Sequence, residues 1–134
     1  MSIVSYANFT SDRQKSAEAY VLKSIDNDKT REASAKQALN DVFLDRGKAC
    51  LTTTVDGKAN IQIKHASAGA KGKDNSVTVF YYVEKNAKQE ITMVYLLALG
   101  SHKSDSTYAI HKQFGQTEFP FKRGTVVNVD GSKV

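Results

Sequence analysis

The stretch that decides the fold runs from residue 76 to residue 111, SVTVFYYVEKNAKQEITMVYLLALGSHKSDSTYAIH. It opens with a run rich in β-branched and aromatic residues, Val77–Glu84, which predicts a strand. A polar turn follows, and the next run, Ile91–Leu99, is apolar at almost every position. Such a run is typical of a central strand that is covered on both faces. The stretch therefore predicts two strands at the centre of a sheet.

The polar residues that follow the second strand are the first candidates for a functional site. The apolar run is expected to end at Gly100, where Ser-His-Lys-Ser-Asp-Ser begins, with Tyr108 shortly after. Functional side chains often lie on loops that a buried scaffold holds in place. His102 and Lys103 lie at such a position.

Upstream, the apolar pattern has a period of two. Ala49–Val55 and Lys58–Ala66 are separated by Asp-Gly, which suits the tight turn of a β-hairpin. In the second strand two isoleucines should face the core, and His65 shares their face. Lys64 would then project onto an open face of the sheet.

Two helices are predicted before this hairpin. Ser11 and Gln14 have the spacing of a capping box at the start of an amphipathic helix. Thr30 is expected to cap a second helix, which ends near Arg46 with Gly47 as a left-handed terminal residue. Both helices are expected to serve as a scaffold.

These elements predict an α+β fold, with two N-terminal helices packed on one curved, mainly antiparallel β-sheet of about four strands. Residues 1–134 are expected to form a single domain, since the length suits one core. Within it, residues 1–47 would be a helical scaffold, 48–111 the sheet with the candidate site, and 112–134 a C-terminal extension.

Composition restricts the partners and the location. The chain is 40% hydrophobic and 25% charged, with a net charge of +5. That charge favours an anionic partner, nucleic acid ahead of a membrane surface. The single cysteine, Cys50, excludes an internal disulfide and suits a reducing compartment. No signal peptide or membrane-spanning run is visible, so we expect a cytoplasmic protein with no membrane partner.

The sequence offers no motif for a metal or a cofactor, and we expect neither. The three histidines, His65, His102 and His111, are far apart, and Cys50 stands alone, so no short ligand-pair spacing exists. The chain also has no phosphate-loop lysine motif, no dinucleotide glycine fingerprint and no nucleophile elbow.

One set of residue types does suit a known chemistry. Cleavage of RNA by its own 2′-hydroxyl needs a proton acceptor, a proton donor and cations for the charge on phosphorus. Histidine exchanges protons near neutral pH, lysine holds phosphate, and tyrosine orients the phosphate or stacks on a base. The residues of this set are Lys64, Lys71, Lys73, His102, Lys103 and Tyr108.

The segment from Val77 to Tyr108 resembles the C-terminal half of the RelE/ParE superfamily of bacterial toxins. In that family two antiparallel strands end in Gly-x-(Arg or His), followed by an apolar stretch and a tyrosine. Here Gly100-Ser101-His102 is followed by Tyr108. Two preceding helices and a strand with an outward lysine, Lys64, are also similar. The resemblance covers roughly residues 10–111 and is closest over 60–108.

The resemblance implies a RelE-like or microbial RNase-like fold and a catalytic set. Lys64 would act at the scissile phosphate, His102 would take the acid–base position and Tyr108 would orient the RNA. Lys71, Lys73 and Lys103 would add RNA-binding charge.

The implied function is a metal-independent endoribonuclease toxin that cleaves RNA through 2′-hydroxyl attack and inhibits translation. Its implied partners are RNA and a cognate antitoxin or immunity protein. The RNA would be mRNA, either free or bound to the ribosome. One residue departs from the pattern, because Thr78 lies where these nucleases usually carry an arginine.

Two other functions fit the same residues. One is a non-catalytic binding protein on this scaffold, such as a ParE-like toxin or a phage or immunity protein, which Thr78 favours. The other is the RNase domain of a secreted bacterial toxin. Purely structural roles are also open: His65 and Tyr108 as core residues, and Lys64 and the loop lysines as solvated surface.

Overall fold

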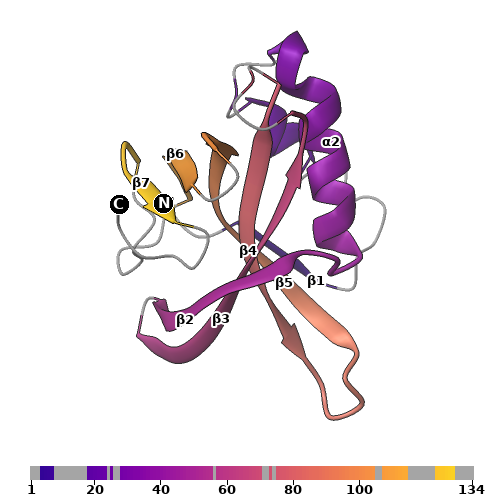
Figure 1. Ribbon diagram of the computed structural model, residues 1–134. Helices are drawn as coiled ribbons and strands as arrows, with labels where there is room; N and C mark the ends of the chain where they lie inside the picture. Colours follow the sequence, from indigo (N-terminus) through magenta and orange to yellow (C-terminus); the bar gives the residue numbers. More distant parts are fainter. Residues whose placement is uncertain are drawn as a thin grey trace.

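The structure is a computed structural model of the chain, shown in Figure 1. It describes residues 4–7, 18–23, 25, 28–55, 57–70, 73, 75–104, 107–114 and 123–128.

Seven strands and the helix α2 form the described framework, with a further helical segment at residues 18–23. In chain order the elements are β1 (Val4–Ala7), α2 (Lys29–Phe43), β2 (Lys48–Val55), β3 (Lys58–Ala68), β4 (Val77–Lys85), β5 (Ile91–His102), β6 (Thr107–Gln113) and β7 (Val126–Asn128).

All described strand pairs are antiparallel, and the sheet has the order β2-β3-β4-β5-β6-β7. β1 pairs with residues 93–96 of β5, whereas β6 pairs with residues 98–102. These two strands therefore lie end to end along one edge of β5. Figure 1 shows the β2–β3 hairpin crossing the direction of β4 and β5, so that the sheet is strongly curled.

The predicted α+β class with a curved antiparallel sheet is confirmed, but about four strands was too low a number. The two predicted hairpins are present as β2–β3 and β4–β5, and Gly57 has the positive φ of 86° that its turn requires. β1, β6 and β7 extend the sheet beyond them. The segment 112–134, expected to be an extension, supplies the end of β6 and all of β7.

Two apolar clusters lie on the two faces of this sheet. One joins α2 to β4 and β5 through residues that include Ala38, Leu39, Val79 and Leu96. The other forms on the opposite face, where the curled strands bring Val55, Ile63, Phe80, Leu97, Tyr108 and Val127 together. Six consecutive residues of β4, Val77–Tyr82, are buried, as the apolar sequence of this hairpin predicted.

Three ends of helices or strands differ from the expectations: the start of α2, the end of α2 and the end of β5. Asp28, not Thr30, caps α2, and its side chain accepts a hydrogen bond from the Thr30 amide at 2.9 Å. The left-handed residue after the helix is Asp45, with φ of 50°, and not Gly47. The Ser11–Gln14 capping box lies outside the described residues.

The third difference concerns β5, which continues through Gly100 to His102 after a bulge at Leu99 and Gly100. A Cβ atom on Gly100 would clash with the carbonyl group of Ala109 in β6. Glycine at this position therefore permits the two strands to approach closely, and it does not end the strand. As a result His102 lies in the sheet, and not in a loop.

No helix in the described part of the chain has the length and apolar character needed to cross a membrane.

Replacing Leu39 by alanine tests the helix–sheet interface. Leu39 is fully buried in the cluster beneath α2, so Leu39→Ala is expected to lower the free energy of unfolding by roughly 2–5 kcal/mol. Leu44→Ala provides the control, because Leu44 is 52% exposed at the end of the same helix, and its loss should cost less than about 0.5 kcal/mol. Urea unfolding followed by circular dichroism measures both. Equal effects of the two substitutions would contradict this packing.

Candidate functional site

A pocket of about 390 Å³ opens where the segment after α2 meets β3, β5 and β6. Its charged, imidazole and phenol side chains come from α2, the segment after it, β2, β3, β5 and β6. They are Asp41, Arg46, Lys48, His65, His102 and Tyr108.

Two histidine rings contact Tyr108 in this pocket. His102 is the register partner of Tyr108 across β5 and β6, and the ring centroids are 4.2 Å apart. The hydroxyl oxygen of Tyr108 also lies 3.2 Å from Nδ1 of His65. β3 and β6 are separated by two strands in the sheet order, so the curl of the sheet creates this contact.

Burial keeps two of these groups uncharged at neutral pH. His65 is 6% exposed, and burial, then the charges of His102 and Lys48, lower its pKa from 6.5 to about 4. Tyr108 is 1% exposed, and burial, followed by the nearby Cys50, raises its pKa to about 12. The pocket floor therefore offers a neutral imidazole beside a protonated phenol.

The backbone around His102 fixes the orientation of its ring. Nδ1 lies 3.1 Å from the carbonyl oxygen of Ser104, and a carbonyl only accepts hydrogen bonds, so Nδ1 carries the proton. The His102 amide also donates to the Ser76 hydroxyl at 3.0 Å. Proton exchange at this ring is thus assigned to Nε2.

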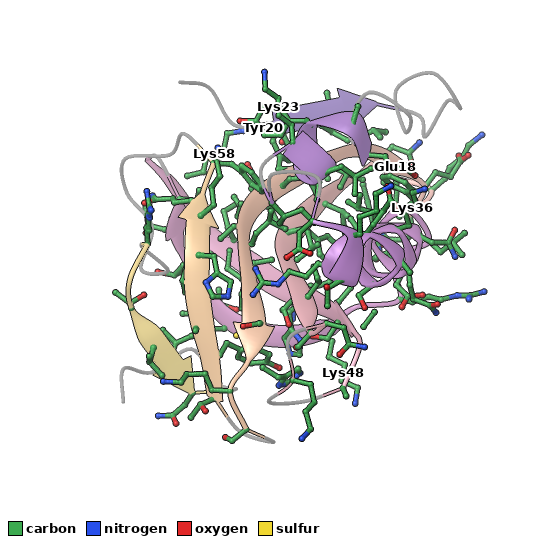
Figure 2. All side chains as sticks on the ribbon, turned by 90° about the horizontal axis from the view of Figure 1, so that it is seen from above. Glu18, Tyr20, Lys23, Lys36, Lys48 and Lys58 are labelled. Carbon is green, nitrogen blue, oxygen red and sulfur yellow. The ribbon has the colours of Figure 1, made fainter. Side chains whose placement is uncertain are left out.

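The rim of the pocket is cationic. Arg46 is exposed in the short segment that joins α2 to β2, and Lys48 is the exposed first residue of β2. Lys48 is the register partner of His65 across β2 and β3, which places the ammonium group near that imidazole. In Figure 2 Lys48 lies on the side of the molecule away from Lys58 and Tyr20. Cations above buried imidazoles suit an anionic ligand such as phosphate.

Of the three predicted catalytic residues, the structure brings His102 and Tyr108 together but not Lys64. Successive side chains of a strand point to opposite faces, so Lys64 points away from the pocket that its neighbour His65 lines. Its Nζ lies 2.9 Å from both carboxylate oxygens of Asp45, and its side chain is 18% exposed. The expected open face is covered there by the segment after α2.

Two of the predicted RNA-binding lysines, Lys73 and Lys103, do not line this pocket. Lys73 is exposed between β3 and β4, and Lys103 is exposed directly after β5, while Lys71 lies outside the described residues. Thr78, where the resembling nucleases carry an arginine, is fully buried, and its hydroxyl lies 2.7 Å from that of Ser67.

His65 was expected to be a structural core residue, and its place in the pocket was not predicted. The assignment was half right, because His65 is buried on the face of Ile63, yet its ring lines the cavity. The hairpin contained the signal, because extending its pairing away from the Asp-Gly turn places Lys48 opposite His65. Arg46 was missed because it was assigned to the end of a helix, and Lys48 was missed because the strand was expected to begin at Ala49.

The third histidine is separate from this group. Nε2 of His111 lies 2.8 Å from the hydroxyl oxygen of Ser101 in β5. Burial and the charge of Arg31 lower the pKa of His111. Within the described residues, no three His, Cys, Asp or Glu side chains are grouped as a metal site would require.

The chain has no match among protein-family models, curated proteins or solved structures. The similarity to the RelE/ParE superfamily therefore depends on its short motif alone, and membership stays a prediction.

Stability should depend on pH through His65. The pKa of His65 is 6.5 in the unfolded chain and about 4 in the folded chain. Because the unfolded chain binds the proton more readily, acidification between these pH values favours unfolding. We expect a loss of at most roughly 3 kcal/mol over this window. Urea unfolding of the wild type and His65→Gln at several pH values isolates the effect, and identical slopes in the two proteins would contradict it.

Proposed function

We propose that this pocket binds RNA and cleaves its backbone without a metal ion, as a single-domain endoribonuclease. The observation that carries the proposal is the pair of imidazoles, His65 and His102, which both contact Tyr108 in a pocket that Arg46 and Lys48 also line. The net charge of +5 supports a polyanionic substrate.

The reaction is an internal transesterification. The ribose 2′-oxygen attacks the adjacent phosphorus while the bond from phosphorus to the 5′-oxygen breaks, giving a 2′,3′-cyclic phosphate and a 5′-hydroxyl. One group takes the 2′ proton, another gives a proton to the 5′-oxygen, and cations stabilise the charge on the phosphorane.

The two histidines suit different halves of this exchange. His65 is neutral at pH 7 and can accept the 2′ proton; a bound phosphate raises its basicity by opposing the charges that lower its pKa. His102, whose Nδ1 donates to the Ser104 carbonyl, would give the Nε2 proton of its imidazolium form to the leaving oxygen and become a neutral imidazole. Arg46 and Lys48 take the phosphate-holding role that the resemblance implied for Lys64.

The biological setting of the proposal is that of the resembling family. We extend it to a RelE-like toxin of the cytoplasm that cleaves mRNA, inhibits translation and is neutralised by an antitoxin. The support is the Gly100-Ser101-His102 and Tyr108 pattern, together with a curved antiparallel sheet that pairs His102 with Tyr108.

Deep burial of Tyr108 and neutral His65 also suit a second function, the binding of an anionic group without catalysis. On that alternative the scaffold serves as a ParE-like toxin or as a phage or immunity protein. The two functions differ in whether bound RNA is cut.

Cleavage of a short RNA oligonucleotide by the purified chain in the presence of a chelator tests the first function. His65→Gln and His102→Gln should each lower the rate by roughly 100-fold or more, because each removes one proton-transfer group. His111→Gln is the matched control, since its ring lies outside the pocket and should leave the rate unchanged. Mass spectrometry should find a 2′,3′-cyclic phosphate, and a 2′-deoxy substrate should remain intact.

Binding of RNA without cleavage would replace the nuclease proposal by the binding alternative. The toxin setting is tested separately, by induced expression of the wild type beside His102→Ala and Tyr108→Ala. Unimpaired growth with intact mRNA in the wild type would remove the toxin setting and leave the chemistry of the purified chain to stand on its own.

A further inference from the structure

We infer that Asp45, Tyr81 and Lys64 form a positioning cluster that holds the Arg46–Lys48 segment over the pocket. None of the three lines the pocket, so each would act through the segment and not on the ligand. The inference depends on the proposed function only in taking the pocket as an anion site.

The segment leaves α2 in a conformation that directs Asp45 inward. Asp45 has φ of 50°, a left-handed conformation that aspartate tolerates better than most residues. Its amide donates to the carbonyl of Val42, and the Arg46 amide donates to the carbonyl of Asp41 at 2.8 Å. The chain therefore turns sharply, and Asp45 and Arg46 diverge to different partners.

The carboxylate of Asp45 is the centre of the cluster. Its side chain is 10% exposed and receives Nζ of Lys64 at 2.9 Å, with Nζ of Lys85 at 3.6 Å. The hydroxyl of Tyr81 donates to Oδ1 of Asp45 at 3.0 Å. A carboxylate this far from water requires such partners, because an unpaired buried charge is strongly unfavourable.

Tyr81 transmits this anchor to the pocket segment. Its hydroxyl oxygen accepts a hydrogen bond from the Gly47 amide at 2.9 Å while its proton is given to Asp45. Burial and Asp45 raise the pKa of Tyr81, so the phenol stays protonated and can do both. One chain of hydrogen bonds thus runs from Lys64 through Asp45 and Tyr81 to Gly47.

Gly47 is held so closely that no side chain fits. A Cβ atom there would lie 2.7 Å from the His65 carbonyl oxygen and would clash with the Tyr81 hydroxyl. The two cationic residues of the rim, Arg46 and Lys48, directly flank this fixed glycine. Their starting positions are therefore set by the contact between Gly47 and Tyr81.

The cluster also gives a role to the lysine on the outer face of β3. Lys64 and His65 are neighbours on opposite faces of the strand: Lys64 binds Asp45, and His65 lines the pocket. A single strand thereby fixes the imidazole directly and the cationic rim through Asp45.

Titration with inorganic phosphate, followed through the ring NMR signals of His65 and His102, tests the cluster in the full chain. Lys64→Met and Tyr81→Phe should weaken phosphate binding about tenfold, the effect of misplacing one charge-assisted hydrogen bond. Lys58→Met is the matched control, because it removes an equal charge from an exposed pair with Glu84. It should leave phosphate binding unchanged.

Lys64→Arg should keep phosphate affinity within about twofold of the wild type, since a guanidinium restores the pair with the carboxylate. Amide NMR spectra identify a temperature at which all variants are folded, and the phosphate affinities are compared at that temperature. Unchanged phosphate affinity in folded Lys64→Met and Tyr81→Phe would overturn the inference. The absence of any phosphate-dependent shift of the histidine ring signals in the wild type would also overturn it.

RNA cleavage measured on the same samples separates the two proposals. A chain that binds phosphate in the expected order of variants but leaves RNA intact would refute the nuclease and support the positioning cluster. A chain that cuts RNA at equal rates in the wild type, Tyr81→Phe and Lys64→Met would refute the cluster and support the nuclease.

Discussion

Six consecutive side chains of β4, from Val77 to Tyr82, are removed from water, and both faces of the sheet must therefore be covered. On one face α2 supplies the cover through its row of small and aliphatic residues around Leu39. No described helix covers the other face, where the sheet curls so that β2, β6 and β7 contribute to the same cluster. The curl that buries this face also brings His65 of β3 to Tyr108 of β6, so the site is a product of core formation.

The alternation in Ala49–Val55 and Lys58–Ala66 and the apolar run at Ile91–Leu99 carried enough information to predict both hairpins and the class of fold. These patterns depend on local burial, which sequence records directly. The extent of the sheet is less visible, because β1 and β7 are only four and three residues long and gain their stability from β5 and β6. Short strands owe their formation to neighbours that are distant in sequence.

The candidate site was predictable in part for the same reason. His102 and Tyr108 pair across one hairpin, a relation that sequence spacing preserves. His65 joins them across two intervening strands, and only the degree of curl decides whether that contact forms. Lys64 was placed on the correct side of β3, opposite the isoleucines, but its partner Asp45 comes from a loop whose path depends on a single left-handed residue.

The electrostatics of the two faces of β3 are complementary. On the outer face a buried carboxylate is balanced by lysines, and this charge is fully committed to structure. On the pocket face burial keeps His65 and Tyr108 neutral, and the cationic side chains of Arg46 and Lys48 are exposed at the rim. The charges of His102 and Lys48 add to burial in lowering the pKa of His65, and an anion in the pocket would oppose these charges. Under the proposed function, binding of an anion would therefore prepare His65 for proton transfer. Gly47 joins the two faces, because its amide binds Tyr81 while its neighbours Arg46 and Lys48 line the pocket.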